Sequence, residues 1–535
     1  MSSLLLRRAG SAALAIGLLS ACSLLVVGSD VQCQNDGDCG KLAAGATCSA
    51  DKVCVGGGVG GACKVNADCP DQNGGPALCR KSDHTCVALL SQDCPRILAK
   101  GAAAVKNDDA IILGTIFSLK GVNQASGVAR TNSAELAASE IEENIVGLPG
   151  GTGGKPRPLV FVACDDSSDN TIATRAAQHL KDVGAPALIG PGGSGLVTAA
   201  AQNATIPGGM FLITPSATST SLSAFNNLVW RTAPSDVLQA VALRDQINAL
   251  ETKFKVDNPA VTKVKLTIVY QNNTYGSGLL DAMTKTLLLN GKPFGDPSNV
   301  GFATPITYDA TTLDPTAAAG QVTTDKPHLI VLVGTSEIIT KFLVPVEANW
   351  PASGTPRPLY LLADAARKQE ALDAAKASDP LRVRIRGTVP GTSNALFSAF
   401  NVRYQGKYSA TASTFGMAGA YDSVYLLLYG MASIGAQPIT GASLATSMAK
   451  MMGGTKIDVG PDGLKTAMPA LGSGNAIDIT GASGPLDFDL VAHEAQSDID
   501  VWCIGKDGTG ATIFSSSGRF YDATKTQMTG VVSCP

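Results

Sequence analysis

The stretch 185–223, "APALIGPGGSGLVTAAAQNATIPGGMFLITPSATSTSLS", decides the fold. Its apolar runs at 185–191 and 209–215 predict two buried strands, and the small residues of 194–204 between them predict a helix. A glycine-rich turn leads from the first strand into this helix, and a charge-free loop of Ser, Ala and Thr follows the second strand. Strand, helix and strand at this spacing are typical of a βαβ unit with parallel strands.

The same alternation extends in both directions along the chain. We expect strands at 110–119, 158–166, 264–271, 328–334 and 358–365, helices at 131–145, 170–184, 276–291 and 337–348, a helical region over 396–450 and a β-rich end at 497–521. About 430 residues of this pattern exceed what one hydrophobic core organises. The fold class is therefore α/β, and we predict two lobes, each built on a doubly wound sheet.

The composition excludes several classes of function. Of the 535 residues 45% are hydrophobic and 16% are charged, and the net charge of −3 provides no basic surface for nucleic acid. The four histidines are scattered, and neither G-x-S-x-G nor H-E-x-x-H occurs. The motif "GPGGSG" at 190–195 fits a dinucleotide fingerprint, but it follows the third strand of its lobe and no acid occurs in 211–223. We predict no enzyme activity, no metal and no cofactor.

Polar side chains follow several of the predicted strands. Ser194 lies in the glycine-rich turn, where glycines let the backbone approach a ligand and a helix N-terminus favours a carboxylate. The carboxylates of "CDDSSD" at 164–169 either cap the following helix or orient a ligand. Tyr275 either contacts a ligand at the carboxyl end of a strand or is a half-buried turn residue.

Ten of the 13 cysteines fall within residues 22–94, and eight of them form a tandem repeat. The spacing x5, x8, x5 between the first four recurs as x5, x9, x6 between the next four: Cys33, Cys39, Cys48 and Cys54, then Cys63, Cys69, Cys79 and Cys86. Each unit is too small for a hydrophobic core, so we expect two disulfides per unit, with three pairings open. Zinc is the alternative, but C-x2-C spacing is absent and His84 is the only nearby histidine.

The N-terminus resembles a bacterial lipoprotein signal. Arg7 and Arg8 precede a short apolar run at 12–19, and the box "LSAC" ends at Cys22. The resemblance implies a signal peptide at 1–21 and a palmitate-type lipid anchor on Cys22. The alternative is an ordinary cleaved signal with Cys22 free for a disulfide. We expect a lipid-anchored protein of the bacterial cell envelope, facing the periplasm or the outer surface, that meets the membrane through this anchor only.

Beyond the repeats, the order of motifs resembles the Leu/Ile/Val-binding branch of the type I periplasmic binding proteins. The matching segments are 110–121, 163–169, 189–223, 229–240, 269–283, 420–433 and 483–489, so the resemblance covers roughly 108–510. The family implies two lobes joined by three crossovers, with a ligand held between lobes that close by hinge motion.

These implications define the expected domains. They are a linker at 22–32, a cysteine-rich module at 33–88, and a bilobal domain at 108–535, with lobe 1 at about 108–235 and 392–483, lobe 2 at about 236–391 and 484–535, and crossovers near 233–237, 387–394 and 481–488.

The resemblance also carries site residues onto this chain. Those expected to contact the ligand are Ser194, Ser216, Ala217, Thr218, Tyr275, Ser336 and Asp364. The chain departs from the amino-acid binders at 334–336, where an aromatic residue is missing, and Asp364 aligns only loosely with their ammonium-binding acid. Their disulfide pattern is also absent, and we expect Cys94–Cys164 and Cys503–Cys534 in its place.

We therefore expect a lipid-anchored solute-binding protein that captures a small polar ligand, such as an amino acid, for an ABC permease. The alternative is a ligand sensor or scaffold on the same fold, in which the cysteine-rich module contacts a partner.

Overall fold

The computed structural model describes residues 34–35, 37–38, 47–48, 54–55, 63–310, 312, 314–351, 354–391 and 394–534. It contains two compact units: the described part of Met1–Pro70 with Cys79–Val87, and Asp71–Leu78 with Ala88–Pro535. The predicted signal peptide, Cys22 and the linker lie outside the described residues. No helix in the described part of the chain combines the length and apolar composition that a membrane crossing requires.

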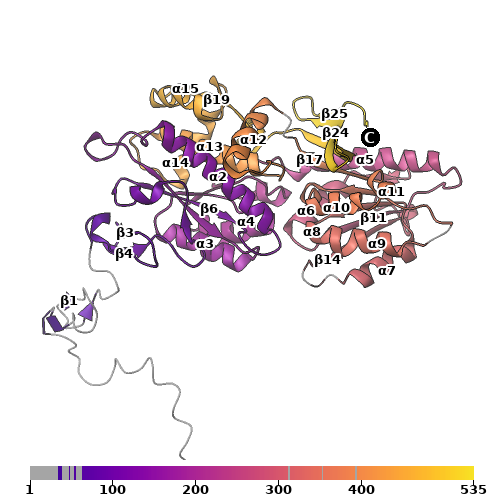
Figure 1. The fold of residues 1–535 in the computed structure, drawn as a ribbon, viewed down its shortest axis with the longest axis horizontal. Helices are drawn as coiled ribbons and strands as arrows, with labels where there is room; N and C mark the ends of the chain where they lie inside the picture. The colour runs from indigo at the N-terminus through magenta and orange to yellow at the C-terminus, as the bar shows by residue number, and fades with distance from the viewer. Residues whose placement is uncertain are drawn as a thin grey trace, which may run out of the picture. The chain divides into compact units, whose positions relative to one another are not determined.

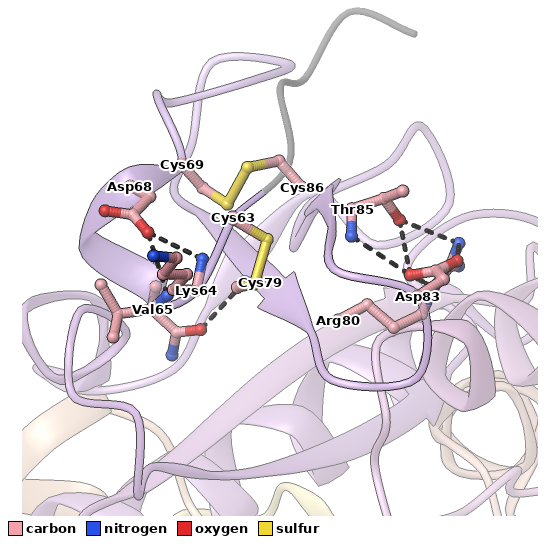
Figure 2. The surroundings of a disulfide bond; sticks show 11 residues. Cys63, Lys64, Val65, Asp68, Cys69, Cys79, Arg80, Asp83, Thr85 and Cys86 are labelled. Atoms are coloured by element: carbon pink, nitrogen blue, oxygen red, sulfur yellow. Dashed lines mark hydrogen bonds and ion pairs between the residues drawn. A yellow bond between two sulfur atoms is a disulfide. The ribbon is translucent and has the colours of Figure 1, made fainter. Parts of the chain in front are cut away.

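Two disulfides hold the second cysteine-rich repeat. Cys63 pairs with Cys79 and Cys69 with Cys86, so the first cysteine joins the third and the second joins the fourth (Figure 2). The sulfurs of Cys63, Cys69 and Cys86 lie within 4.8 Å of one another. All three are bound in disulfides, as the disulfide interpretation of the repeat expects, and a disulfide sulfur offers no thiolate to a metal. Cys48 of the first repeat is also disulfide-bonded, and the pairing of that repeat lies outside the described residues.

One turn recurs in both repeats. In the second, a carboxylate oxygen of Asp68 accepts hydrogen bonds from the backbone amides of 64–65 at 2.7 and 3.1 Å (Figure 2). In the first, Asp38 accepts from the amides of 34–35 at 2.9 and 3.3 Å. The aspartate before the second cysteine thus satisfies two amides that no strand or core would satisfy in so small a unit. In the second repeat the strands β3 (Ala77–Arg80) and β4 (Thr85–Ala88) then form a two-stranded sheet.

The second unit contains two eight-stranded sheets. The first sheet has the order β21-β22-β10-β9-β8-β6-β7-β5. Its strands are β5 (Arg96–Ile97), β6 (Ile111–Phe117), β7 (Leu159–Asp165), β8 (Ala187–Ile189), β9 (Phe211–Thr214), β10 (Val229–Arg231), β21 (Phe488–Asp489) and β22 (Glu494–Ala495). The strands β7, β6, β8, β9 and β10 are parallel to one another, and their order is that of a doubly wound fold, 2-1-3-4-5.

Helices cover both faces of this sheet. They are α2 (Gln124–Asn144), α3 (Asn170–Asp182), α4 (Ser194–Ala200) with its π-helical continuation η4 (Ala201–Thr205), α12 (Ala395–Tyr408), α13 (Met417–Ile434), α14 (Gly441–Ser447) and α15 (Pro461–Gly472). Figure 1 shows α2 and α3 on opposite sides of β6. Leu113 and Phe117 of β6 lie in one core with α2 and α13. Because both faces are buried, all seven residues of β6 are buried, which explains its continuous apolar run.

The second sheet repeats this architecture with the order β14-β11-β15-β16-β17-β23-β24-β25. Its strands are β11 (Leu266–Gln271), β14 (Ala303–Tyr308), β15 (Leu329–Val333), β16 (Leu359–Leu362), β17 (Ile385–Pro390), β23 (Ile499–Lys506), β24 (Thr512–Asp522) and β25 (Gln527–Thr529). The first five are parallel, again in the order 2-1-3-4-5, and the last three are antiparallel.

Its helices are α5 (Asp236–Asp257), α6 (Thr274–Thr284), α7 (Pro315–Asp325), α8 (Ser336–Ile338) with π-helical η7 (Ile339–Leu343), α9 (Val344–Asn349), α10 (Gln369–Lys376) and α11 (Asp379–Arg382). Side chains of α5 and α6 pack on one face of the sheet, and those of α7, η7, α9 and α10 on the other. The two doubly wound lobes predicted from the sequence are thereby confirmed.

Three connections join the lobes. The chain passes from β10 to α5 between Arg231 and Asp236 and from β17 to α12 between Pro390 and Ala395, and these connections overlap the crossovers expected near 233–237 and 387–394. We expected the third crossover near 481–488, whereas β21 and β22 still pair within the first sheet, and the passage to β23 lies between Ala495 and Ile499. The short hairpin of β21 and β22 carries too few residues to show a strand pattern in the sequence.

Two further disulfides tie ends of the second unit to its sheets. Cys94 pairs with Cys164 of β7, and Cys503 of β23 pairs with Cys534, which are the two pairs expected. Antiparallel pairing of β5 with β7 and a hydrogen bond from Asp165 N to Asp93 O at 2.6 Å reinforce the first connection.

Candidate functional site

The carboxyl ends of the parallel strands carry most of the residues predicted to contact a ligand. Doubly wound sheets bind ligands at this edge, beside the point where the strand order reverses. In the first sheet this point lies between β6 and β8, and in the second between β11 and β15. The two edges meet, because Ser219 Oγ after β9 donates to the carbonyl of Thr274 at the start of α6, at 2.9 Å.

The glycine-rich turn and the Ser/Thr loop hold each other in place. Ser216 Oγ donates to Gly192 O at 2.8 Å, and Ser194 Oγ accepts from Ser219 N at 3.2 Å. Ala217 is buried, and its amide donates to Thr214 Oγ1 at 3.3 Å. Most hydrogen bonds of this edge are therefore made within the first lobe, and they rigidify the loop.

Thr218 and Asp236 carry three of the buried polar atoms that make no close hydrogen bond among the described residues. The Thr218 hydroxyl and both carboxylate oxygens of Asp236 are buried, and none of them makes a hydrogen bond among the described residues. The Thr218 hydroxyl faces this carboxylate, and Asp236 N donates to Thr218 O at 2.8 Å. Burial, reinforced by the charge of Asp364, raises the pKa of Asp236 well above its usual range.

Asp364 is the centre of the second lobe's contribution. Its Oδ1 accepts from Tyr275 OH at 2.6 Å and from Gln239 Nε2 at 3.0 Å. Gln239 Nε2 also lies 3.3 Å from Thr388 Oγ1, and Gln239 Oε1 is buried without a partner in this part of the chain. Burial raises the pKa of Asp364. Tyr275 is 8% exposed and donates a hydrogen bond to this carboxylate, so it is buried and not the half-buried turn residue of the alternative.

Arg130, from α2, provides a positive charge between the acids. Its Nε and Nη2 donate to Phe415 O at 3.1 and 2.9 Å. Burial lowers the pKa of Arg130 to about 10, although Asp166 and Asp364 both favour its charged form. A β-carbon at Gly192 would lie 2.7 Å from Arg130 Nη1. The glycine therefore permits the close approach of the guanidinium to the turn.

The acids of "CDDSSD" divide between the two roles considered for them. Asp169 caps α3 by accepting from Thr171 N and Ile172 N at 2.8 and 3.0 Å. Asp166 Oδ1 accepts from Ser118 Oγ at 2.5 Å, while Asp166 Oδ2 is buried and unpaired among the described residues. Burial raises the pKa of Asp166.

Lys368 crosses between the lobes and donates to Ser126 Oγ of α2. Burial, together with the charge of Arg130, lowers the pKa of Lys368 to about 8. This ammonium therefore adds a second cation to the region in which Asp364 and Arg130 lie.

The structure does not bring Ser336 into this group. Ser336 begins α8, and its carbonyl accepts from Thr340 Oγ1 at 3.2 Å. The neighbouring Glu337 takes the polar contacts here, since its Oε1 accepts from Tyr308 OH at 2.7 Å and from Thr335 N at 3.0 Å.

We call the remaining group the interlobe polar cluster: Arg130, Asp166, Thr218, Asp236, Gln239, Tyr275, Asp364 and Lys368. It combines hydroxyls, carboxylates and cations, so it can pair both ends of a zwitterion. A buried polar atom without a partner costs folding free energy, and a bound ligand removes that cost by supplying the missing hydrogen bond.

Sequence reasoning missed Arg130, Asp236, Gln239 and Lys368 as site residues. Asp236 and Gln239 are three positions apart on α5 and therefore share one helix face, and this spacing was a usable signal. Arg130 and Lys368 carried no such signal, because their positions follow from how α2 and the segment after β16 pack.

These features define a two-lobed α/β binding fold with polar groups gathered between the lobes. A model of the periplasmic binding protein family matches residues 110–498, and the chain belongs to this family. No curated protein matches the chain.

Solved structures share the fold. The substrate-binding protein LivJ of a branched-chain amino acid transporter from Streptococcus pneumoniae, in complex with isoleucine, is 20% identical, with 76% of this chain and 99% of that chain covered and a TM-score of 0.56. A solute-binding protein of an ABC transporter from Rhodopseudomonas palustris, in complex with 3,4-dihydroxy benzoic acid, is 14% identical, with 80% and 99% covered and a TM-score of 0.56. At these identities the likeness establishes the shared fold.

Proposed function

We propose that this chain is a lipid-anchored extracytoplasmic solute-binding protein that captures a small polar ligand, an amino acid or related compound, between two closing lobes for an ABC transporter. One observation carries the proposal: the buried Asp236 carboxylate has no polar side-chain partner among the described residues other than the facing Thr218 hydroxyl. Solved relatives by fold are described as binding isoleucine, leucine or an aromatic acid for transporters, which supports a solute of this kind.

The cluster suits the two ends of an amino acid. The buried Asp236 carboxylate forms no ion pair among the described residues, so a ligand ammonium group can pair with it. The hydroxyls of Ser194 and Thr218 have hydrogens to offer a ligand carboxylate, since Ser194 Oγ only accepts in the contacts described. Hydrogen bonds strengthen when the lobes exclude water. The ligand favours the closed form only through its higher affinity for that form.

The first test is a thermal-shift screen of the full chain against amino acids and small carboxylates, with native mass spectrometry of the protein as purified to find a retained ligand. Asp236→Asn and Thr218→Val should each lower the affinity for the identified ligand. For Asp236→Asn the loss should be about 30-fold or more, because this substitution removes a buried ionic contact. Isothermal titration calorimetry provides the affinities.

The matched control is Asp169→Asn, which makes the same chemical change at an exposed helix cap that asparagine also satisfies. It should leave affinity unchanged. Equal affinity of the wild type, Asp236→Asn and Thr218→Val for every ligand found would contradict the proposed binding site.

The anchor is tested separately. Mass spectrometry of the membrane fraction should find diacylglycerol on Cys22 at the mature N-terminus, and an unmodified Cys22 within a longer chain would contradict the proposed anchor.

A sensor or scaffold on the same fold is the alternative, and the cysteine-rich module favours it, because a transport receptor needs no such module to bind a solute. Deletion of the whole chain distinguishes the two. Ligand uptake by cells should fall in that strain if the chain serves a permease and should be unaffected if it is a sensor, and a strain lacking only residues 33–88 should keep its uptake in the first case.

A further inference from the structure

Two of the three connections between the lobes leave the first sheet side by side. The strands β10 and β22 pair in parallel, with Arg231 of β10 opposite Glu494 of β22. Residues 232–235 lead from β10 to α5, and residues 496–498 lead from β22 to β23. The remaining connection, from β17 to α12, is joined to the second of these, because Gly391 N donates to the carbonyl of residue 498 at 2.7 Å. All three connections are therefore linked to the place where Arg231 and Glu494 face each other.

Arg231 and Glu494 form a buried ion pair at this place. The Arg231 side chain is 2% exposed and that of Glu494 is 16% exposed. Arg231 Nε donates to Glu494 Oε2 at 3.1 Å, and Arg231 Nη2 donates to the same oxygen. Arg231 N also donates to His493 O at 3.0 Å, so backbone and side chain both hold the start of β22. Because apolar side chains often replace a buried ion pair without loss of stability, such a pair points to a role beyond stabilising the fold.

The other donors of the guanidinium hold the Ser/Thr loop, residues 216–223. Arg231 Nη1 donates to Ser219 O at 2.7 Å, and Nη2 donates to Ser223 Oγ at 2.5 Å. Ser223 Oγ in turn donates to Glu494 Oε2 at 2.9 Å. Ser219 follows Thr218 of the interlobe polar cluster, and its hydroxyl makes the contact with α6 of the second lobe. One side chain thus joins β10, β22 and the loop that carries several of the expected ligand contacts.

The charges of the pair also act on Asp236. Burial raises the pKa of Asp236 well above its usual range, and the charge of Asp364 adds to this rise. The positive charge of Arg231 opposes the rise, and the negative charge of Glu494 reinforces it. Removal of the Glu494 charge alone would therefore favour the ionised form of Asp236, which is the form that pairs with an ammonium group.

A second buried ion pair has the same chemistry away from the connections. Arg384 and Glu347 of the second lobe have side chains 13% and 12% exposed, and both Nη atoms of Arg384 donate to Glu347. Arg384 precedes the amino end of β17, whereas the connection to α12 leaves from the carboxyl end of this strand. This pair provides a matched control for the first.

We propose that Arg231 is a positioning residue for ligand binding, which through its pair with Glu494 fixes two neighbouring connections and the Ser/Thr loop to the first lobe. Closure of the lobes then bends residues 232–235 and 496–498 beyond the pair, while the loop keeps the geometry in which it meets a ligand. Arg231 acts through its partners, because Nε, Nη1 and Nη2 all donate within the fold. The inference rests on the proposed function, since it requires a ligand between the lobes.

The test compares Glu494→Gln with Glu347→Gln in the purified full chain. Each substitution removes one charge of a buried pair and keeps the shape of the side chain, so urea unfolding should show similar losses of stability. The probes are the standard amino acids and benzoate, each supplied alone, and the compound that gives the wild type its largest thermal shift is used for calorimetry. Glu494→Gln should lower the affinity for this compound by about 10-fold, whereas Glu347→Gln should leave the affinity unchanged.

Hydrogen exchange of the ligand-free protein separates positioning from stability. In Glu494→Gln the amides of 219–223, 232–235 and 496–498 should exchange about 10-fold faster than in the wild type, because the pair no longer restrains local opening there. In Glu347→Gln these segments should exchange as in the wild type.

Arg231→Lys provides a second variant if Glu494→Gln folds poorly. Lysine keeps a positive charge beside Glu494 but lacks the fork of donors that reaches several partners at once. The same three segments should exchange faster than in the wild type, to a smaller extent than in Glu494→Gln.

Three results would overturn the inference. The first is equal affinity and equal exchange in Glu494→Gln and Glu347→Gln, which would make the Arg231 pair purely structural and leave the proposed function to the test with Asp236→Asn. The second is tighter binding by Glu494→Gln, which would mean that the Glu494 charge acts on Asp236 and that the pair does not position the loop. The third is a wild type that binds none of the probes, which would count against the proposed function and the inference together.

Discussion

Two buried carboxylates of the second unit, Glu140 and Asp236, differ in how many hydrogen bonds the fold supplies to them. Glu140 of α2 has both oxygens occupied: Oε1 accepts from Arg403 Nε at 2.8 Å, and Oε2 from the hydroxyls of Tyr421 and Tyr425 at 2.5 and 2.8 Å. Asp236 is as deeply buried, yet both of its oxygens are unpaired among the described residues. The first carboxylate has all its hydrogen bonds supplied by the fold, whereas the second has only the facing Thr218 hydroxyl beside it.

The largest expected change in stability comes from removing the fully hydrogen-bonded carboxylate of Glu140. Glu140→Ala leaves Arg403 and two tyrosine hydroxyls without their acceptor, so the free energy of unfolding should fall by about 3 kcal/mol. Ligand affinity of the folded fraction should not change, because Glu140 lies away from the site. Urea unfolding followed by circular dichroism measures the loss. Glu143→Ala, an exposed position on the same helix, should stay within about 0.5 kcal/mol of the wild type.

The unpaired carboxylate should behave in the opposite way. Asp236→Asn replaces a buried acid, which must either keep a proton that the unfolded chain releases or carry a desolvated charge, by a neutral amide, so the ligand-free protein should gain about 1–2 kcal/mol of stability. Urea unfolding of ligand-free protein checks this. A loss of stability as large as that of Glu140→Ala would mean that Asp236 is structural, and the contrast between the two acids would fail.

The gain should depend on pH. The pKa of Asp236 is raised in the folded state by burial, so the folded protein holds this proton more tightly than the unfolded chain. Stability from this group is therefore greatest below its unfolded pKa near 3.8 and falls as pH rises toward the folded value. The stabilisation by Asp236→Asn should accordingly be largest at neutral pH and shrink toward pH 4. Unfolding curves at pH 4.5, 6 and 7.5 measure it; a pH-independent difference would contradict it.

The smallest effect concerns an exposed carboxylate that is paired only to backbone. Asp169→Ala removes the N-cap of α3 and should cost about 1 kcal/mol. Asp169→Asn retains a capping oxygen and should cost almost nothing. Thermal unfolding of the two variants side by side separates loss of the cap from loss of the charge.

The sequence predicted the fold because seven of the ten parallel strands carry a local apolar signal, whereas β10, β14 and β17 were not predicted. The run at 185–191 gives β8, and the alternation with helices is repeated in both lobes. It missed α5, whose polar face contains Gln239 and Gln246, buried here, and β14, where alternating exposure hides a strand in "ATPITY". Neither element shows the apolar period that marks the rest.

The members of the candidate site were predictable only where the chain itself brings residues to a strand end. Ser194, Ser216, Ala217, Thr218, Tyr275 and Asp364 follow their strands directly, and the structure gathers them at the facing edges. Arg130 and Lys368 reach the same region through packing between segments distant in sequence. No local pattern records such a meeting, so sequence reasoning had no access to the cations of the cluster.

The disulfide between Cys94 and Cys164 determines which lobe receives a force applied to the N-terminal side of the chain. It joins the segment that enters the second unit to β7, an inner strand of the first sheet, and the β5–β7 pairing runs alongside. Tension applied to the chain ahead of residue 94 therefore passes into the first lobe and bypasses the three connections to the second. A protein tethered from its N-terminal side would hold one lobe still and leave the other free to swing.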